Sequence, residues 1–146
     1  MTTPDDVVKA ALAYVGTRFR LQGRNLTGID CCGLLVNCGR EAGLDIKDTT
    51  RYDHSQFDLH GPDPKGDLFL SFIRGQSDMI EGKRPMHGAI ALLRQTIFPM
   101  HCGIIDHSGQ DAYLIHANVR KGVQRDRWFG TWHTHLIEFR SYRGYE

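Results

Sequence analysis

The sequence predicts one α+β domain over residues 1–146, with N-terminal helices packed on a central antiparallel β-sheet. Two observations predict this class. Before Gly75 the apolar residues recur at helical spacing, between polar residues that start helices and glycines that end them. After Gly75 they form short runs separated by turn residues, which is typical of strands. A chain of 146 residues can bury one hydrophobic core without disulfides or metals.

The first helix is predicted from a start signal at residues 3–6. Thr3 takes the N-cap position, Pro4 takes the first helical position, and two acidic residues follow in the first turn. The apolar face that follows is closed by Gly16. Its members are Val7, Val8, Ala11, Leu12 and Val15.

A second helix follows the loop at residues 17–28. Asp30 stands where an N-cap belongs, so Cys31 falls in the first turn, and the apolar segment runs to Ala42 and stops at Gly43. The exposed N–H groups and the positive end of the helix dipole favour a thiolate there, which is the nucleophilic form of cysteine. The alternative interpretation is a small buried residue at a helix start.

The middle of the chain is polar and rich in turn residues. Residues 44–65 are predicted to form a long surface excursion, whose aromatic residues either line a binding groove or face solvent. These aromatic residues are Tyr52, His54 and Phe57. A short helix is predicted over residues 67–73, ended by Gly75.

The second half predicts the sheet. Residues 101–106 and 112–117 are separated by a turn at 107–110 and form an antiparallel hairpin. Further strands are predicted at residues 87–93, 122–124 and 136–142. The aromatic-rich connection at residues 127–132 is assigned to core packing rather than to a ligand site.

Two histidines lie at positions that suit cysteine chemistry. A cysteine nucleophile needs a base, and the base needs an orienting partner. His101 opens the first hairpin strand and His116 ends the second, so the two come close to facing each other. If the start of the cysteine helix packs against that end of the sheet, Cys31 meets His101 with His116 behind it. The chain has eight histidines, so composition alone does not select this pair.

The motifs resemble those of the NlpC-type, papain-like cell-wall peptidases. Residues 30–35 resemble the family's Asp-Cys-Ser/Leu-Gly-Leu nucleophile motif, and residues 101–104 resemble its His-x-Gly-Ile motif. Residues 16–20, 88–93 and 115–117 are similar to three further family motifs, in the family order. The resemblance runs from Val7 to the C-terminus. It is closest to short members encoded among phage-tail and gene-transfer-agent genes, which end in a Trp-rich stretch and an Arg/Phe strand, as this chain does at Trp128, Trp132, Phe139 and Arg140.

The resemblance implies a papain-like NlpC-type fold and amide hydrolysis in the peptide stem of bacterial peptidoglycan. Cys31 would be the nucleophile, His101 the base and His116 the orienting residue, with no metal and no cofactor. Support or substrate binding falls to Asp30, Phe19, Cys32 and Gly33. The expected partners are peptidoglycan stem peptides and other tail or hub proteins of a phage-like particle.

Three positions depart from the family pattern. Phe19 stands where the family usually has a tyrosine, and Ala89 stands where it usually has an acidic residue. Cys32 replaces a common serine, and is interpreted as either a harmless small residue or a redox liability. The first rival interpretation is therefore a structural tail-tip or hub component that has lost turnover. The second is a metal site with ligands from Cys31, Cys32, Cys102, His101 or His116, although adjacent cysteines cannot chelate as a C-x-x-C pair does. The third is a transferase that passes the acyl group to something other than water.

Charge and hydropathy limit the classes of partner that can be expected. The 18 basic and 17 acidic residues leave a net charge of +1, which gives no electrostatic case for a nucleic-acid partner. No apolar run approaches the ~20 residues that cross a bilayer, so no membrane insertion is expected. The first residues lack the features of a signal peptide. We therefore expect synthesis in the bacterial cytoplasm with reduced thiols, and delivery to the cell wall in the periplasm as part of a virion or tail.

Overall fold

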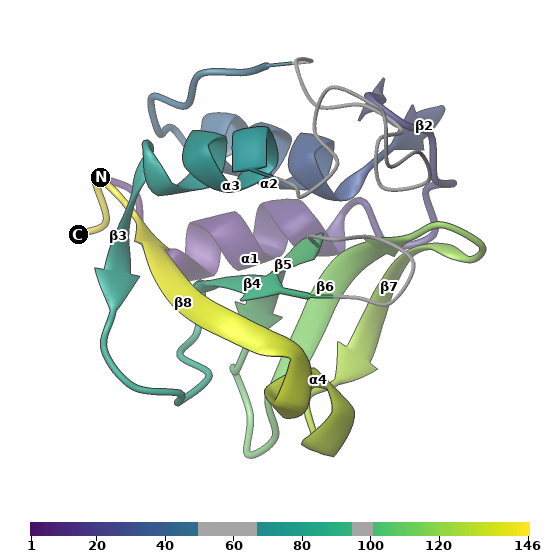
Figure 1. Cartoon of the computed structure of the whole chain (residues 1–146). Helices are drawn as coiled ribbons and strands as arrows, with labels where there is room; N and C mark the ends of the chain where they lie inside the picture. The colour runs from purple at the N-terminus through teal and green to yellow at the C-terminus, as the bar shows by residue number, and fades with distance from the viewer. Residues whose placement is uncertain (50–66, 95–100) are drawn as a thin grey trace.

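Three helices lie on one side of a six-stranded antiparallel sheet in the computed structural model (Figure 1). The structure describes residues 1–49, 67–94 and 101–146. Within these ranges helices α1 and α2 pack on each other and on strand β5, and α2 also contacts β6. The predicted α+β class is confirmed. The proposed groove-lining residues Tyr52, His54 and Phe57 lie outside the described residues.

Helix α1 (Pro4–Leu12) begins as predicted but ends early. Thr3 accepts a hydrogen bond from the Asp6 N–H, and the Asp6 carboxylate accepts one from the Thr3 N–H, so the two form a capping box. The predicted apolar face is wrong at its end, because Leu12 and Val15 are exposed. The chain leaves the helix after Leu12, which turns Tyr14 into the core in their place.

Helix α2 (Cys31–Glu41) has the predicted limits. Asp30 caps its start, and beyond its C-cap residue Gly43 takes a φ of +103°, which favours glycine. The prediction of a plain loop before α2 is wrong. That segment contains a hairpin of two-residue strands, β1 (Arg24–Asn25) and β2 (Gly28–Ile29), which are too short to show an alternating pattern.

The sheet has the strand order β3-β8-β4-β5-β6-β7, and all neighbours in it are antiparallel. The predictions for β5 and β8 are confirmed. Strand β3, which follows α3 (Asp67–Arg74), was not predicted. Strand β4 was predicted from residue 87 but begins at residue 90, and β7 was predicted to end at residue 124 but continues to residue 127. The bounds are β3 Ser77–Ile80, β4 Ile90–Leu93, β5 His101–Asp106, β6 Tyr113–Asn118, β7 Gly122–Arg127 and β8 Leu136–Tyr142.

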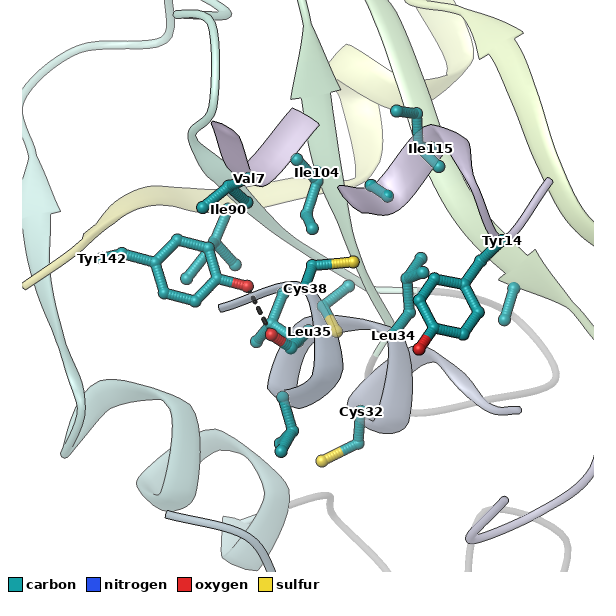
Figure 2. Close-up of a cluster of buried hydrophobic side chains, with 14 of the residues drawn as sticks. Val7, Tyr14, Cys32, Leu34, Leu35, Cys38, Ile90, Ile104, Ile115 and Tyr142 are labelled. Carbon is teal, nitrogen blue, oxygen red and sulfur yellow. Dashed lines mark hydrogen bonds between the residues drawn. The ribbon is translucent and has the colours of Figure 1, made fainter. Parts of the chain in front are cut away.

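The main hydrophobic core fills the space between the helices and the sheet (Figure 2). Leu34 and Leu35 of α2 enter it beside Ile104 of β5 and Ile115 of β6. The Tyr142 hydroxyl donates a 2.6 Å hydrogen bond to the Leu35 carbonyl and so ties β8 to α2. This core fixes where the start of α2 stands relative to β5.

A second apolar cluster lies on the opposite face of the sheet. Strand alternation sends Leu114 and Ile105 to this face, where the connection after β7 covers them. Trp128 and Trp132 pack against the cluster, which agrees with the predicted core packing, whereas Phe129 is 61% exposed. The short helix α4 (Gly130–His135) carries Trp132. No helix in the described part of the chain is long and apolar enough to cross a membrane.

Candidate active site

The carboxylate of Asp30 organises the start of α2. It is buried, and it accepts hydrogen bonds from the N–H of Gly33 at 2.7 Å and from the N–H of Gln22 at 2.7 Å. The guanidinium of Arg24 adds a contact of 3.1 Å to the same carboxylate, and its Nε also contacts Asp48. Asp30 therefore joins the first turn of the helix to the β1–β2 hairpin.

Gly33 is required by the close approach of these two segments. A Cβ placed on Gly33 would lie 2.3 Å from the carbonyl oxygen of Gly23, far closer than atoms can pack. A side chain here would push the hairpin away from the first turn of α2. The absence of a side chain at Gly33 lets the backbone at Gly23, just before β1, touch the first turn of the helix.

Cys31 is the first residue of α2, where backbone N–H groups have no partner within the helix. It is half-buried, whereas Cys32, Cys38 and Cys102 are buried. The Cys102 thiol donates a 3.4 Å hydrogen bond to the carbonyl oxygen of Cys31. Because Cys102 directly follows His101 in β5, this contact sets the start of α2 at the end of β5 that carries His101. Cys32 has no exposed surface and belongs to the main core.

His101 and His116 form a buried pair. Nε2 of His101 lies 2.9 Å from Nδ1 of His116, and both side chains are buried. Their strands are adjacent and antiparallel, which brings the two rings to the same face of the sheet. Gly103 of β5 lets β6 approach closely at this point, because a Cβ on it would lie 2.6 Å from Leu114 Cδ1, 2.7 Å from the Ile115 carbonyl oxygen and 3.1 Å from the His116 Cβ.

Burial controls the charge of both histidines. Burial, reinforced by the neighbouring His116, holds the pKa of His101 well below its usual value. Burial also lowers the pKa of His116, although Asp126 opposes that shift. At neutral pH the pair is therefore uncharged, and its rings can accept and pass on a proton. Burial and the contact with Cys31 raise the pKa of the Cys102 thiol well above its usual value, so Cys102 remains a thiol.

Two residues of this site were not predicted from the sequence. Nε2 of His116 lies 2.6 Å from Oδ2 of Asp126 in β7, so the histidine pair continues to a carboxylate. The ring of Trp132 meets the His116 ring edge-on, with centroids 4.9 Å apart. Had the predicted strand after Gly122 been extended by two residues, alternation would have placed Asp126 on the face of His116.

Phe19 lies beside the segment that leads to the nucleophile helix. It forms an isolated parallel bridge with Ile29, one residue before Asp30, and its partly buried ring packs against the main core. Its side chain cannot donate a hydrogen bond, because a phenyl ring carries no hydroxyl. Among the described residues, no group of three or more His, Cys, Asp or Glu side chains is arranged to hold a metal ion.

The arrangement suits nucleophilic catalysis by a thiol. A half-exposed cysteine stands at a helix start, and an uncharged histidine at the adjacent strand end has one ring nitrogen engaged by a second histidine. The other ring nitrogen of His101, Nδ1, is then the atom that can take a proton from a thiol. Backbone N–H groups at the helix start are suited to stabilise an oxyanion.

Comparison with known proteins gives a family match. A family model described as NlpC/P60 family matches residues 16–141. No curated protein sequence matches the chain.

Solved structures share the fold. An NlpC/P60 family protein from Bacillus cereus has a TM-score of 0.68 and 14% identity, over 97% of this chain and 41% of that one. A protein similar to lipoproteins of the NLP/P60 family from Staphylococcus aureus has a TM-score of 0.58 and 18% identity, over 95% and 41%. The NlpC/P60 domain of the peptidoglycan hydrolase SagA has a TM-score of 0.56 and 17% identity, over 95% and 97%. The chain thus spans about two fifths of the first two proteins and nearly all of the third.

Proposed function

The chain belongs to the NlpC/P60 family, and we propose that it is a cysteine peptidase that hydrolyses amide bonds in the peptide stem of bacterial peptidoglycan. The observation that carries this proposal is the buried hydrogen bond between His101 and His116, at the strand end where Cys102 contacts the main chain of Cys31. A nucleophile, a base and an orienting group thus come from three separate segments of the chain.

The reaction proceeds through a thioester. His101 takes the thiol proton of Cys31 at Nδ1, and the thiolate attacks the carbonyl carbon of the stem peptide to form a C–S bond. Backbone N–H groups at the start of α2 stabilise the oxyanion. The proton passes from His101 to the amine nitrogen as the C–N bond breaks. Water then attacks the thioester, gives a proton to His101 and releases the acid, and the thiol is restored.

The proposed substrate is supported by the family and by one of its members. The NlpC/P60 domain of SagA belongs to a peptidoglycan hydrolase and has nearly the same length as this chain. A half-exposed cysteine at a helix start is accessible to a flexible peptide, whereas the three other cysteines are buried.

We further propose that the enzyme works in a phage tail or a phage-like particle. Support comes from the resemblance of the sequence to the short members found among such genes, including the tryptophans at 128 and 132. In this setting the chain is made in the bacterial cytoplasm, joins other tail or hub proteins, and opens the cell wall locally from the periplasm while DNA enters.

A second candidate function is a structural role in the tail tip or hub without turnover. Phe19 favours it, because a phenylalanine replaces the tyrosine hydroxyl that helps to arrange nucleophile and substrate in the related peptidases. In that case Cys31→Ala leaves both particle assembly and infectivity, or gene transfer, unchanged. For the peptidase, the same variant assembles normally but loses infectivity or transfer.

The direct test is mass spectrometry of purified muropeptides after incubation with the chain. We expect new fragments from the wild type and none from Cys31→Ala, and the fragment masses identify the bond that is cut. The matched control is Cys38→Ala, which removes a buried thiol from the same helix and should retain cleavage. Fragments that carry a new acyl acceptor in place of water would indicate a transferase. Absence of new fragments with the wild type would contradict the proposal for the isolated enzyme.

A further inference from the structure

The row of hydrogen bonds at the site does not stop at the histidine pair. Nδ1 of His116 faces Nε2 of His101 at 2.9 Å, and Nε2 of His116 faces Oδ2 of Asp126 at 2.6 Å. His116 therefore has both ring nitrogens engaged. Its ring is buried, whereas the Asp126 side chain is 40% exposed and lies at the outer end of the row.

The position of Asp126 follows from the register of β6 and β7. His116 pairs with Gln124, and Leu114 pairs with Asp126, so Asp126 is the diagonal neighbour of His116 on the same face. The flanking arginines are engaged elsewhere: Arg125 pairs with Asp106, and Arg127 pairs with Asp111. The register of β6 and β7 therefore places the Asp126 carboxylate next to the His116 ring.

The chemistry of the carboxylate determines which nitrogen carries each proton. An ionised carboxylate can only accept hydrogen bonds, so Nε2 of His116 must carry the proton in that contact. A neutral imidazole has one proton, which leaves Nδ1 of His116 as an acceptor. Nε2 of His101 must then be the donor in the 2.9 Å contact between the rings. By the same rule, Nδ1 of His101 is left without a proton.

We propose that Asp126 is a positioning residue that fixes the tautomer of His116 and, through it, keeps Nδ1 of His101 free to accept the thiol proton of Cys31. This inference rests on the proposed cysteine peptidase mechanism. Without Asp126, His116 can carry its proton on Nδ1 and donate it in the hydrogen bond to His101. Nε2 of His101 then becomes the acceptor, and the proton of His101 moves to its Nδ1. That Nδ1 is the atom that must serve as the base. A fraction of the protein then has a base in the wrong protonation state.

The test measures the tautomers directly in the full chain. Long-range ¹H–¹⁵N correlation NMR on ¹⁵N-histidine-labelled protein at neutral pH distinguishes a protonated Nε2 from a protonated Nδ1. We expect both His101 and His116 of the wild type to be protonated on Nε2. In Asp126→Val, which removes the acceptor but suits an edge strand, a population protonated on Nδ1 should appear for both rings. Asp126→Glu, which keeps a carboxylate, should restore the wild-type tautomers.

A second readout follows the consequence for the thiol. The rate of Cys31 alkylation by iodoacetamide should fall about tenfold in Asp126→Val, by analogy with the 10- to 100-fold losses that follow removal of the hydrogen-bond partner of a metal-bound histidine. The matched control is Asp111→Asn, which removes an exposed carboxylate close to Arg127 and should leave the rate and both tautomers unchanged.

The outcomes separate this inference from the peptidase proposal. If Asp126→Val keeps the wild-type tautomers and alkylation rate, Asp126 does not position the pair and the inference is wrong. If the tautomers change as expected but the wild-type chain cleaves no peptidoglycan, the role of Asp126 stands and the proposed substrate is wrong.

Discussion

Removal of the Asp30 carboxylate should destabilise the protein far more than loss of an ordinary helix cap. Asp30→Ala loses the cap on Gly33, which is worth about 1 kcal/mol. It also leaves the N–H of Gln22, now bonded at 2.7 Å, without its acceptor, at a cost of about 1–3 kcal/mol. Gln22 has a φ of +59°, so its turn can relax once the hydrogen bond is gone and recover part of that cost. The expected loss in the free energy of unfolding is about 3 kcal/mol.

Urea unfolding followed by circular dichroism measures this loss. The matched control is Thr3→Ala, which removes the N-cap of α1 where it is exposed, and should cost about 1 kcal/mol or less. Asp30→Asn keeps one side-chain carbonyl oxygen for two backbone donors. Its loss in the free energy of unfolding should therefore lie between those of Asp30→Ala and Thr3→Ala. Equal losses for Asp30→Ala and Thr3→Ala would refute the idea that Asp30 holds the hairpin to the helix start.

Two further predictions concern packing and pH. Gly33→Ala should lower the free energy of unfolding by about 2 kcal/mol, because the new methyl group meets the Gly23 carbonyl. The control is Gly130→Ala, which has open space at the Cβ position and should not lower it. Equal effects of the two substitutions in urea unfolding would contradict the steric argument. The free energy of unfolding should fall as pH drops from about 6.5 towards 5. The fold lowers the pKa of His101 and His116 and keeps both neutral, whereas in the unfolded chain both take up protons in this range. Urea midpoints at pH 7 and 5.5 measure this, and His116→Asn should show a smaller difference; equal midpoints for the wild type would contradict it.

Those parts of the fold that depend on local signals could be predicted from the sequence. Asp30 and Gly43 mark the ends of α2 through hydrogen bonding and backbone conformation, which neighbouring residues determine. Strand β3 could not be predicted, because only Ser77 at its start is buried and Asp78 and Met79 are exposed. It is a strand because it pairs with β8, more than 50 residues away in the sequence.

The same distinction applies to the candidate site. Cys31 begins α2 and His101 begins β5, so both lie where the sequence predicts them. The prediction that His116 ends its strand is wrong, because β6 continues to Asn118, but His116 still lies close enough to His101 for the hypothesis to bring them together. Asp126 stands between two arginines, a pattern typical of a solvated charged segment. Its contact with His116 depends on the register of β6 and β7, which hairpin length and side-chain packing determine together.

The cost of the histidine row bears on the choice between an enzyme and a structural protein. A fold that needs only packing gains nothing from two buried imidazoles, since polar groups lose hydration on burial and must be paired. In this protein Gly103 allows β6 to approach β5 closely at His116, and Asp126 pairs with the His116 ring from the next strand. Apolar side chains at these positions would stabilise the sheet more simply. A protein that keeps a fully paired row ending at His101, beside the half-exposed Cys31, has the arrangement that proton transfer from a thiol requires, and this favours turnover over a purely structural role.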